Sequence, residues 1–420
     1  MKIKTRHCDI IITGSGIAGL WLHARLRSAG YRCVLLENRA CGFGQTIASQ
    51  GIIHGGTKYN LSGRLSRASQ ALANMPRVWR SCLEGREKPD LTCAQFLSAH
   101  QYLCSTGSVS SKFTAFAART VIRSGITHLQ REQLPSFLDA RTFHGSAYQL
   151  DEPVLDVPSV LRALEALVPS GELLKINQEG GMKIHSALDD ERVLVSIRGD
   201  DGEEMLLDAA AIVFTAGLGN ERLKSLVPAT QLRTQRRPLH MMMVRFPNDA
   251  SKLIPRVYSH FLGAGALPRV TITTHISRLD GSVVLYLGGE IAERGVGRDG
   301  DAQREVACDL LRELLPELPY DRALFASHFV DRAEPKQSKG KRPDSCVATM
   351  HGRVIAAWPV KLALSPHLCE CVEGMLREKN IIPVQDGKDD WVDESLLRWE
   401  RPVVADVPWE REEVVWNKCC

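Results

Sequence analysis

The chain lacks any apolar run of the ~20 residues that a helix needs to cross a bilayer, so we expect no transmembrane segment. It also lacks an excess of one charge: 53 basic and 49 acidic residues leave a net charge of +4, which indicates no nucleic-acid partner. Repeats and low-complexity tracts are absent, so a repeat architecture is not expected. The remaining composition, 44% hydrophobic and 24% charged over 420 residues, is typical of a soluble globular protein of about two domains.

The sequence also lacks the ligand spacing of a metal centre. Its twelve cysteines are scattered, and the only close pairs are Cys369 with Cys371 and Cys419 with Cys420. Neither pair has zinc-site spacing with histidine partners, so we predict no metal site. The first 13 residues do not resemble a signal peptide, because their short apolar stretch is needed as a strand. We therefore expect a cytoplasmic protein, with peripheral attachment to a membrane as the alternative.

The most informative segment is a strand, glycine turn, helix, strand and terminal acid within residues 9–37. Asp9–Ile12 predicts the first strand, Ile17–Ala29 the helix and Arg32–Glu37 the second strand. The run Gly14-Ser-Gly-Ile-Ala-Gly19 leads from the first strand into the first turn of the helix, and Gly30 ends the helix. This order is the fingerprint of a βαβ unit that binds a dinucleotide. The alternative is an ordinary buried βαβ unit with coincidental glycines.

Each part of the fingerprint has a physical role. Gly14 allows the tight turn out of the strand, Gly16 lets a pyrophosphate approach the backbone, and Gly19 lets the helix pack closely on the sheet. The N–H groups and positive dipole end of the helix receive the phosphate charge. Glu37 ends the second strand, where its carboxylate can accept hydrogen bonds from a ribose.

After Glu37 the sequence departs from a regular βαβ repeat. Residues 41–56 are rich in glycine and polar residues, and they look like backbone that lies along an extended cofactor. This pattern disfavours a simple nicotinamide-dependent dehydrogenase, which would continue with strand–helix repeats. A helix over about Arg64–Leu83 follows, and the Asp156–Pro158 pair predicts the start of another helix.

The rest of the chain alternates between strand patterns and single helices. An antiparallel meander over residues 182–208 leads into a buried strand that ends at Thr215-Ala-Gly217. Strands are predicted over Met241–Phe246, Arg269–Thr274 and Ser282–Leu287, with a helix near Ala302–Leu315. A strand–turn–helix pattern begins at Val354, and the tail from Asp389, which contains four tryptophans, receives no fold assignment.

Together these segments resemble the D-amino-acid-oxidase-like FAD-dependent oxidoreductases. The resemblance spans Cys8–Val372 and depends on the fingerprint, Gly51–Gly56, Leu155–Val160 and Thr215–Gly217. Gly51–Gly56 is most similar to the branches of glycerol-3-phosphate and 2-hydroxyglutarate dehydrogenases. The implied fold is α/β (α+β overall), a Rossmann-like FAD-binding domain interleaved with a β-sheet substrate domain. The FAD-binding domain would comprise residues 1–85, 145–235 and 335–388, the substrate domain 86–144 and 236–334, and the tail 389–420.

The resemblance also implies which residues contact FAD. The residues expected to bind it are Gly14, Ser15, Gly16, Ile17, Ala18, Gly19, Glu37, Asn38, Gln45, Thr46, Ser49, Gln50, Gly51, Ala216, Gly217, Val360 and Lys361. The chain departs from the family where amine oxidases have a glycine-rich turn, because Trp358-Pro-Val-Lys-Leu stands there. Val360 and Lys361 are nevertheless expected to offer N–H groups to the flavin pyrimidine carbonyl.

Four side chains are candidates for catalysis. His54 could take the proton from a substrate hydroxyl as hydride leaves, and Lys361 could stabilise the reduced flavin by its charge. His275 could face the substrate, and Arg332 could bind a carboxylate or phosphate. The alternatives are a structural histidine at 54, a solvated lysine at 361 and a solvent-facing strand-end histidine at 275, and the basic run from Lys336 to Arg342 is expected to be a solvated loop.

The resemblance implies an FAD-dependent oxidase or dehydrogenase. It would oxidise a C–H bond next to a hydroxyl or amine of a small anionic substrate by hydride transfer to the flavin, with oxygen or a quinone as electron acceptor. The alternative is an FAD-binding subunit or scaffold without its own catalysis, with the tryptophan-rich tail as contact surface. A homo-oligomer or a partner bound through the tail is a further possibility.

Overall fold

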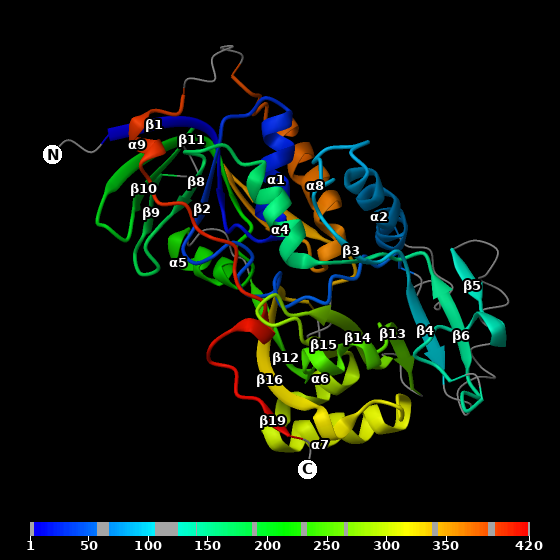
Figure 1. Cartoon of the computed structure of the whole chain (residues 1–420). Helices are drawn as coiled ribbons and strands as arrows, with labels where there is room; N and C mark the ends of the chain where they lie inside the picture. The colour runs from blue at the N-terminus through cyan, green and yellow to red at the C-terminus, as the bar shows by residue number, and fades with distance from the viewer. Residues whose placement is uncertain are drawn as a thin grey trace.

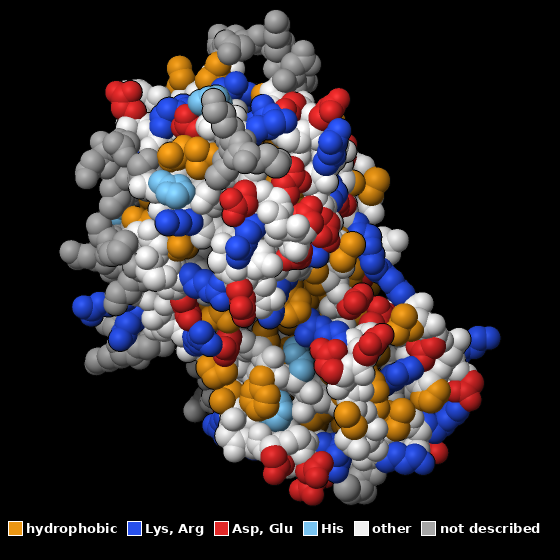
Figure 2. Space-filling model, turned by 90° about the vertical axis from the view of Figure 1, so that its left-hand side faces the viewer, with side chains coloured by type: hydrophobic (Ala, Val, Ile, Leu, Met, Phe, Trp, Pro, Cys, Tyr) orange, Lys and Arg blue, Asp and Glu red, His pale blue; other side chains and the backbone are white. Residues whose placement is uncertain are grey.

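Two large sheets organise the computed structural model, one above the other in Figure 1. The structure describes residues 4–56, 67–105, 125–139, 141–186, 191–227, 233–263, 268–337, 343–384 and 391–418. In this part of the chain no helix combines the length and apolar character that a membrane crossing requires. Figure 2 shows acidic and basic side chains mixed over one face of the molecule.

The first sheet forms around β1 (Lys4–Thr13) and has the strand order β17-β18-β11-β1-β2-β8. β1 pairs in parallel with β11 and β2, and the pairs β11–β18 and β2–β8 are also parallel. Residues 8–13 of β1 are all buried, as expected of a parallel strand covered on both faces. The other strands are β2 (Cys33–Glu37), β8 (Leu173–Lys175), β11 (Glu204–Phe214), β17 (Val347–His351) and β18 (Val354–Trp358), and β9 (Met182–Ser186) and β10 (Val193–Arg198) extend antiparallel from β11.

Helices cover this sheet. α1 (Ile17–Ser28) packs against α8 (Ser365–Glu378) and α4 (Val157–Ala166), and α2 (Arg67–Leu83) lies beside α8 (Figure 1). α4 begins where the sequence predicts, because the Asp156 side chain accepts a hydrogen bond from the Ser159 N–H at 3.1 Å. α1 ends one residue before the predicted Ala29.

The second sheet has nine strands in the order β19-β16-β12-β15-β14-β13-β4-β6-β5. Its neighbours are antiparallel except for the parallel pair β13–β4. The strands are β4 (Gln101–Ser105), β5 (Ile126–His128), β6 (Ser146–Leu150), β12 (Thr234–Phe246), β13 (Tyr258–Leu262), β14 (Pro268–Ile276), β15 (Val283–Gly288), β16 (Leu324–Pro335) and β19 (Asn417–Lys418). α6 (Glu290–Arg294) and α7 (Gly300–Leu314) pack on it.

Shorter elements connect the sheets. β3 (Phe96–Ser98) pairs with β7 (Val154–Leu155), and Ile52 forms an isolated bridge to Val154. The remaining short helices are α5 (Leu223–Leu226) and α9 (Glu394–Leu397), with 3₁₀ turns that include η3 (Gly217–Arg222), η9 (Leu362–Leu364) and η10 (Pro408–Glu410).

The C-terminal tail packs along both sheets (Figure 1). The Trp399 indole N–H donates to the Lys175 carbonyl at 2.6 Å, and Val404 forms a parallel bridge with Cys41. Farther on, Trp409 is buried against the second sheet, and β19 extends that sheet at β16. Two of the four tail tryptophans, Trp399 and Trp409, are therefore packing anchors on the chain itself.

The predicted α/β class is confirmed: a mainly parallel sheet with helices stands beside a mainly antiparallel one. The six-segment domain division stays a prediction. β6, which lies in a segment assigned to the FAD-binding domain, pairs in the second sheet, so the strands change sheet after Leu150. The long strand β16 was not predicted from the sequence, because its middle is polar and only partly buried.

Candidate functional site

The turn between β1 and α1 needs glycine at two positions for different reasons. Gly14 has φ +88°, and a Cβ there would lie 2.4 Å from the Ala216 Cα. A Cβ on Gly19 would lie 1.9 Å from the Gly14 carbonyl oxygen. The two glycines therefore let the ends of β1, β11 and α1 meet. Gly16 differs, since a Cβ there would approach only the Thr46 hydroxyl, at 3.1 Å.

The N-terminus of α1 has the character of an anion site. Gly16 is the N-cap residue and provides no side-chain cap, and the first turn of the helix contains no acidic residue. The Ile17 N–H donates to the Thr46 hydroxyl at 3.2 Å, so residue 46 borders this helix end. Backbone N–H groups and the positive end of the helix dipole favour a phosphate there. The turn thus fits the pyrophosphate of a dinucleotide.

Glu37 lies beside this turn at the end of β2. Its Oε2 accepts from the N–H and the hydroxyl of Ser15, both at 2.8 Å, and its Oε1 accepts from the N–H groups of Asn38 and Arg39, both at 2.9 Å. These four donors match the about four lone-pair positions of a carboxylate. A ribose hydroxyl would replace the rotatable Ser15 hydroxyl most readily, because the other three donors belong to the backbone.

The end of β11 closes the other side of the turn. The Thr215 hydroxyl donates to the carbonyls of Thr13 and Gly14, at 2.8 and 3.0 Å. The buried Asn220 accepts from the Ala216 N–H at 2.9 Å and donates to carbonyls of β11 and β18. Asn220 was not predicted, and an amide soon after a small-residue strand end is the signal that could have found it. Gly217 has φ +55° and lies next to the Gln45 side chain.

Residues 48–51 join this region to the second sheet. The Gln50 side-chain amide donates to the carbonyls of Thr271 and Tyr286, at 2.9 and 2.8 Å. The Tyr286 hydroxyl donates to the Ala48 carbonyl at 2.9 Å. Gly51 has φ +72°, and its carbonyl accepts from the Leu155 N–H. The predicted cofactor segment, including the buried Ser49 hydroxyl, therefore lies at the junction of the two sheets.

His54 follows this segment and is held by a buried carboxylate. Its Nδ1 lies 3.3 Å from Glu152 Oε2, and Glu152 Oε1 accepts from the Gly55 N–H at 2.7 Å. The Gln101 side-chain amide also donates to Glu152, whose side chain is 4% exposed while that of His54 is 31% exposed. The carboxylate orients the imidazole ring.

A second histidine stacks on the first. The His260 ring in β13 lies 5.6 Å from that of His54 at an interplanar angle of 14°, and its Nδ1 is 2.6 Å from the Thr271 hydroxyl. His54, Glu152 and His260 thus gather at the junction from three distant parts of the chain. Neither Glu152 nor His260 was predicted from the sequence, and no local motif marks either residue.

His275 lies in a buried environment at the end of β14. It is 4% exposed, its Nε2 lies 3.0 Å from the Thr273 hydroxyl, and its ring packs 4.4 Å from that of Trp409. Burial lowers the pKa of His275 to about 3, so this ring is neutral at physiological pH. The alternative of a solvent-facing histidine at 275 is therefore wrong, because Trp409 of the C-terminal tail covers this end of the strand.

Arg332 and Lys361 occupy separate surroundings. Arg332 donates to Glu293 at 3.0 Å and to the Arg237 carbonyl at 3.2 Å, within the edge region of β12 and β16. Lys361 is 7% exposed, which excludes the solvated alternative, and its N–H donates to the Pro359 carbonyl at 2.7 Å. The intervening Val360 has φ +62°, a strained conformation for a β-branched residue. Such strain is common at ligand sites, which agrees with the flavin contact predicted for this turn. That contact stays a prediction.

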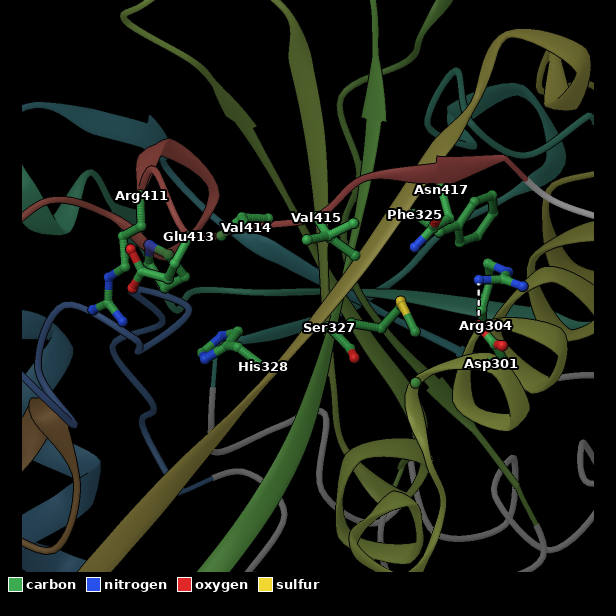
Figure 3. Close-up of a pocket in the computed structure, with 14 residues that line it drawn as sticks. Asp301, Arg304, Phe325, Ser327, His328, Arg411, Glu413, Val414, Val415 and Asn417 are labelled. Atoms are coloured by element: carbon green, nitrogen blue, oxygen red, sulfur yellow. Dashed lines mark hydrogen bonds and ion pairs between the residues drawn. The ribbon is translucent and has the colours of Figure 1, made fainter.

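A cavity of about 320 Å³ lies between the tail and the second sheet (Figure 3). His328 of β16 and Arg411 of the tail line it, together with Glu413 and Ser327. His328 Nε2 lies 2.9 Å from the Tyr286 hydroxyl, which also bonds to Ala48. Burial and the Arg411 charge lower the pKa of His328 to about 4. This cavity was not predicted from the sequence, because residues more than 80 positions apart, such as His328 and Arg411, form it.

Comparison with known proteins identifies the family. Residues 9–354 match the model of the DAO family, described as FAD-dependent oxidoreductases. The chain belongs to this family. FAD is its cofactor, and it is an oxidoreductase.

Individual relatives agree with this assignment. A Pseudomonas aeruginosa protein with the name "probable FAD-dependent oxidoreductase" is 43% identical over 407 residues, which cover 96% of this chain and 97% of the relative. The crystal structure of that protein superposes with a TM-score of 0.78 at 38% identity, over 97% of this chain and 98% of the other. Glycine oxidase from Geobacillus kaustophilus shares the fold at 16% identity, with a TM-score of 0.61 over 95% of this chain and 100% of its own.

Proposed function

We propose that this oxidoreductase oxidises the C–H bond next to a hydroxyl or amine of a small anionic substrate by hydride transfer to FAD. The observation that carries the proposal is the His54–Glu152 pair, 3.3 Å apart, at the junction of the two sheets. It places a partly exposed imidazole, backed by a buried carboxylate, directly after the segment expected to contact the cofactor.

The residues proposed to hold FAD surround the β1–α1 turn. The N-terminus of α1 receives the pyrophosphate, and Glu37 receives the ribose after displacement of the Ser15 hydroxyl. The segment 45–51, the β11 end at Ala216 and Gly217, and the Val360–Lys361 turn complete the site. When bound, FAD supplies a two-electron acceptor for the hydride.

His54 is proposed to manage the proton. Glu152 engages Nδ1, so the imidazole presents Nε2 to a substrate hydroxyl or ammonium group. As the C–H bond breaks, Nε2 takes the proton, and the buried carboxylate of Glu152 stabilises the resulting imidazolium. The stacked His260, anchored by the Thr271 hydroxyl, limits rotation of the His54 ring.

Cationic side chains are proposed to favour an anionic substrate and reduced flavin. The buried Lys361 places a positive charge next to the predicted flavin contact. Arg332 is proposed to bind a substrate carboxylate or phosphate by exchanging its present partner Glu293, 3.0 Å away. Oxygen or a quinone is proposed to reoxidise the enzyme.

The alternative of a scaffold without catalysis finds little support in the tail. Trp399 and Trp409 are each 6% exposed and pack against the chain itself, so they form no exposed platform for a partner.

The test is anaerobic mixing of the purified yellow protein with 2-hydroxy acids, amino acids and glycerol phosphate. We expect one class to bleach the flavin absorbance, and reoxidation by oxygen or a quinone then identifies the acceptor. His54→Gln should slow flavin reduction about 10²–10⁴-fold with FAD content unchanged. A panel that leaves the flavin oxidised would refute the substrate class, and normal reduction in the His54 variant would refute its role.

A further inference from the structure

Two cysteines and a histidine meet where α8 packs against β17. Cys346 directly precedes β17, and His367 and Cys371 lie on α8. A spacing of four residues places His367 and Cys371 on the same face of the helix. α8 packs against β17, which brings this face to Cys346. The sequence had predicted no metal site, since the third residue lies more than 20 positions before the helical pair.

The ligand atoms of this cluster are close enough for one cation. A ring nitrogen of His367 and the sulfurs of Cys346 and Cys371 all lie within 4.8 Å of one another. Around a tetrahedral zinc ion, with Zn–S of about 2.3 Å and Zn–N of about 2.0 Å, such atoms are separated by about 3.5–3.8 Å. Small side-chain rotations would bring the three ligand atoms from their present separations, of up to 4.8 Å, to these values. All three residues are partly exposed, so an ion has access from solvent.

The surroundings also resemble those of a metal-binding histidine. His367 Nδ1 lies 3.1 Å from the Glu370 carboxylate, one helical turn along α8. Histidines that ligate metals commonly use one ring nitrogen for the ion and donate the other N–H to a carboxylate. Two thiolates and an imidazole select zinc or a similarly soft divalent cation over magnesium or calcium.

We propose that Cys346, His367 and Cys371 form a zinc site, with Glu370 as the carboxylate that orients the histidine and water as the fourth ligand. Both cysteines carry free thiols in the structure. The ion would join Cys346, at the start of the β17–β18 hairpin, to α8, which follows that hairpin in the chain. The Val360–Lys361 turn lies between Cys346 and His367 in the chain, so an ion that links these two residues would restrict the movement of that turn. The ion itself takes no part in the proposed proton and hydride transfer.

The first experiment measures metal in the holoenzyme. After purification with reducing agent and dialysis against added zinc, we expect about one tightly held zinc per chain. Cys346→Ser and Cys371→Ser should each lower the bound zinc at least tenfold. Cys93→Ser, which removes an exposed thiol elsewhere, is the matched control and should retain the ion. Equal zinc content in all four proteins, or none in the unmodified enzyme, would overturn the proposal.

Two further measurements keep the test independent of folding. Glu370→Gln preserves all three ligands and should weaken zinc affinity about 10–100-fold, with unchanged FAD content and circular dichroism. Cobalt substituted for zinc should give red-region d–d bands typical of a tetrahedral sulfur-containing site, where oxidised flavin does not absorb. Octahedral cobalt bands would overturn the proposal. So would a Cys346–Cys371 disulfide in peptide maps of protein isolated without air.

Discussion

The β1–α1 turn and the His54 junction are built in contrasting ways. The turn itself is formed within a short stretch, as in the bond between Ser15 and Glu37, which are 22 positions apart, and only the end of β11 joins it from 202 positions away, through Thr215 and Thr13. The junction joins residues 98 positions apart in the His54–Glu152 pair and 221 apart between Gln50 and Thr271. Close approach of backbone atoms defines the β1–α1 turn, whereas hydrogen bonds between side chains and distant segments define the junction around His54. The comparison shows that the glycine turn has a local sequence signature although β11 closes it, whereas the reacting end is assembled from distant side chains that carry no such signature.

The largest effect should come from Gly19→Ala in the turn. Its Cβ would lie 1.9 Å from the Gly14 carbonyl oxygen and 2.7 Å from the Thr215 hydroxyl, and the Gly14 backbone cannot move aside easily. Although alanine favours helices, we expect a loss of about 3 kcal/mol in the free energy of unfolding, and loss of FAD. Urea denaturation and flavin absorbance measure both.

Gly16→Ala is the matched control for this prediction. Its Cβ would approach only the Thr46 hydroxyl, at 3.1 Å, so stability should change by less than about 1 kcal/mol while FAD affinity falls. If the two variants lost the same stability, the assignment of separate roles to these glycines would be wrong.

Glu152→Gln should produce the next largest effect, at the junction. The amide preserves the shape and can still accept from the Gly55 N–H, but it cannot stabilise an imidazolium at His54. We expect flavin reduction to slow about 100-fold, measured by anaerobic stopped-flow, with little change in FAD content. A normal rate would show that the junction does not carry the proton transfer.

A smaller effect concerns the pH dependence of stability near the junction. His275 has a pKa of about 3 in the folded state against 6.5 for the free side chain, so the unfolded chain binds more protons between these values. Stability is therefore complete above about pH 6.5 and falls as the pH drops towards 3. This single group should contribute a loss of about 2 kcal/mol between pH 6.5 and 5.

His275→Gln should make the unfolding free energy less dependent on pH in that range, as judged by urea denaturation at several pH values. His328, with a pKa of about 4, adds a parallel slope that the variant retains. An unchanged pH dependence would mean that the tail does not bury His275 in solution.

The smallest effect should come from a charged contact at the C-terminal end of α1. Arg25 of α1 forms two hydrogen bonds to Glu373 of α8, at 3.0 and 3.2 Å, but its side chain is 36% exposed. Because solvent screens such pairs, Arg25→Met should cost less than about 1 kcal/mol in thermal or urea unfolding. A loss comparable to that of Gly19→Ala would show that this ion pair secures α1 as strongly as the close backbone approach at its N-terminus.

Local sequence patterns were enough to predict the βαβ unit, the Asp156 helix cap and the central strands of the second sheet. These features depend on periodicity and on neighbours within a few turns. The family match confirmed FAD and the α/β class. The glycine turn was predictable residue by residue, because backbone geometry permits few alternatives at Gly14 and Gly19.

Tertiary structure alone decided the partners of the polar side chains. It placed Glu152 and His260 beside His54, covered His275 with Trp409, and brought Cys346 to the helix that carries His367 and Cys371. Such contacts depend on how strands and helices distant in the chain pack together. A sequence pattern specifies which face of an element is apolar, but many pairings of those faces satisfy the same pattern.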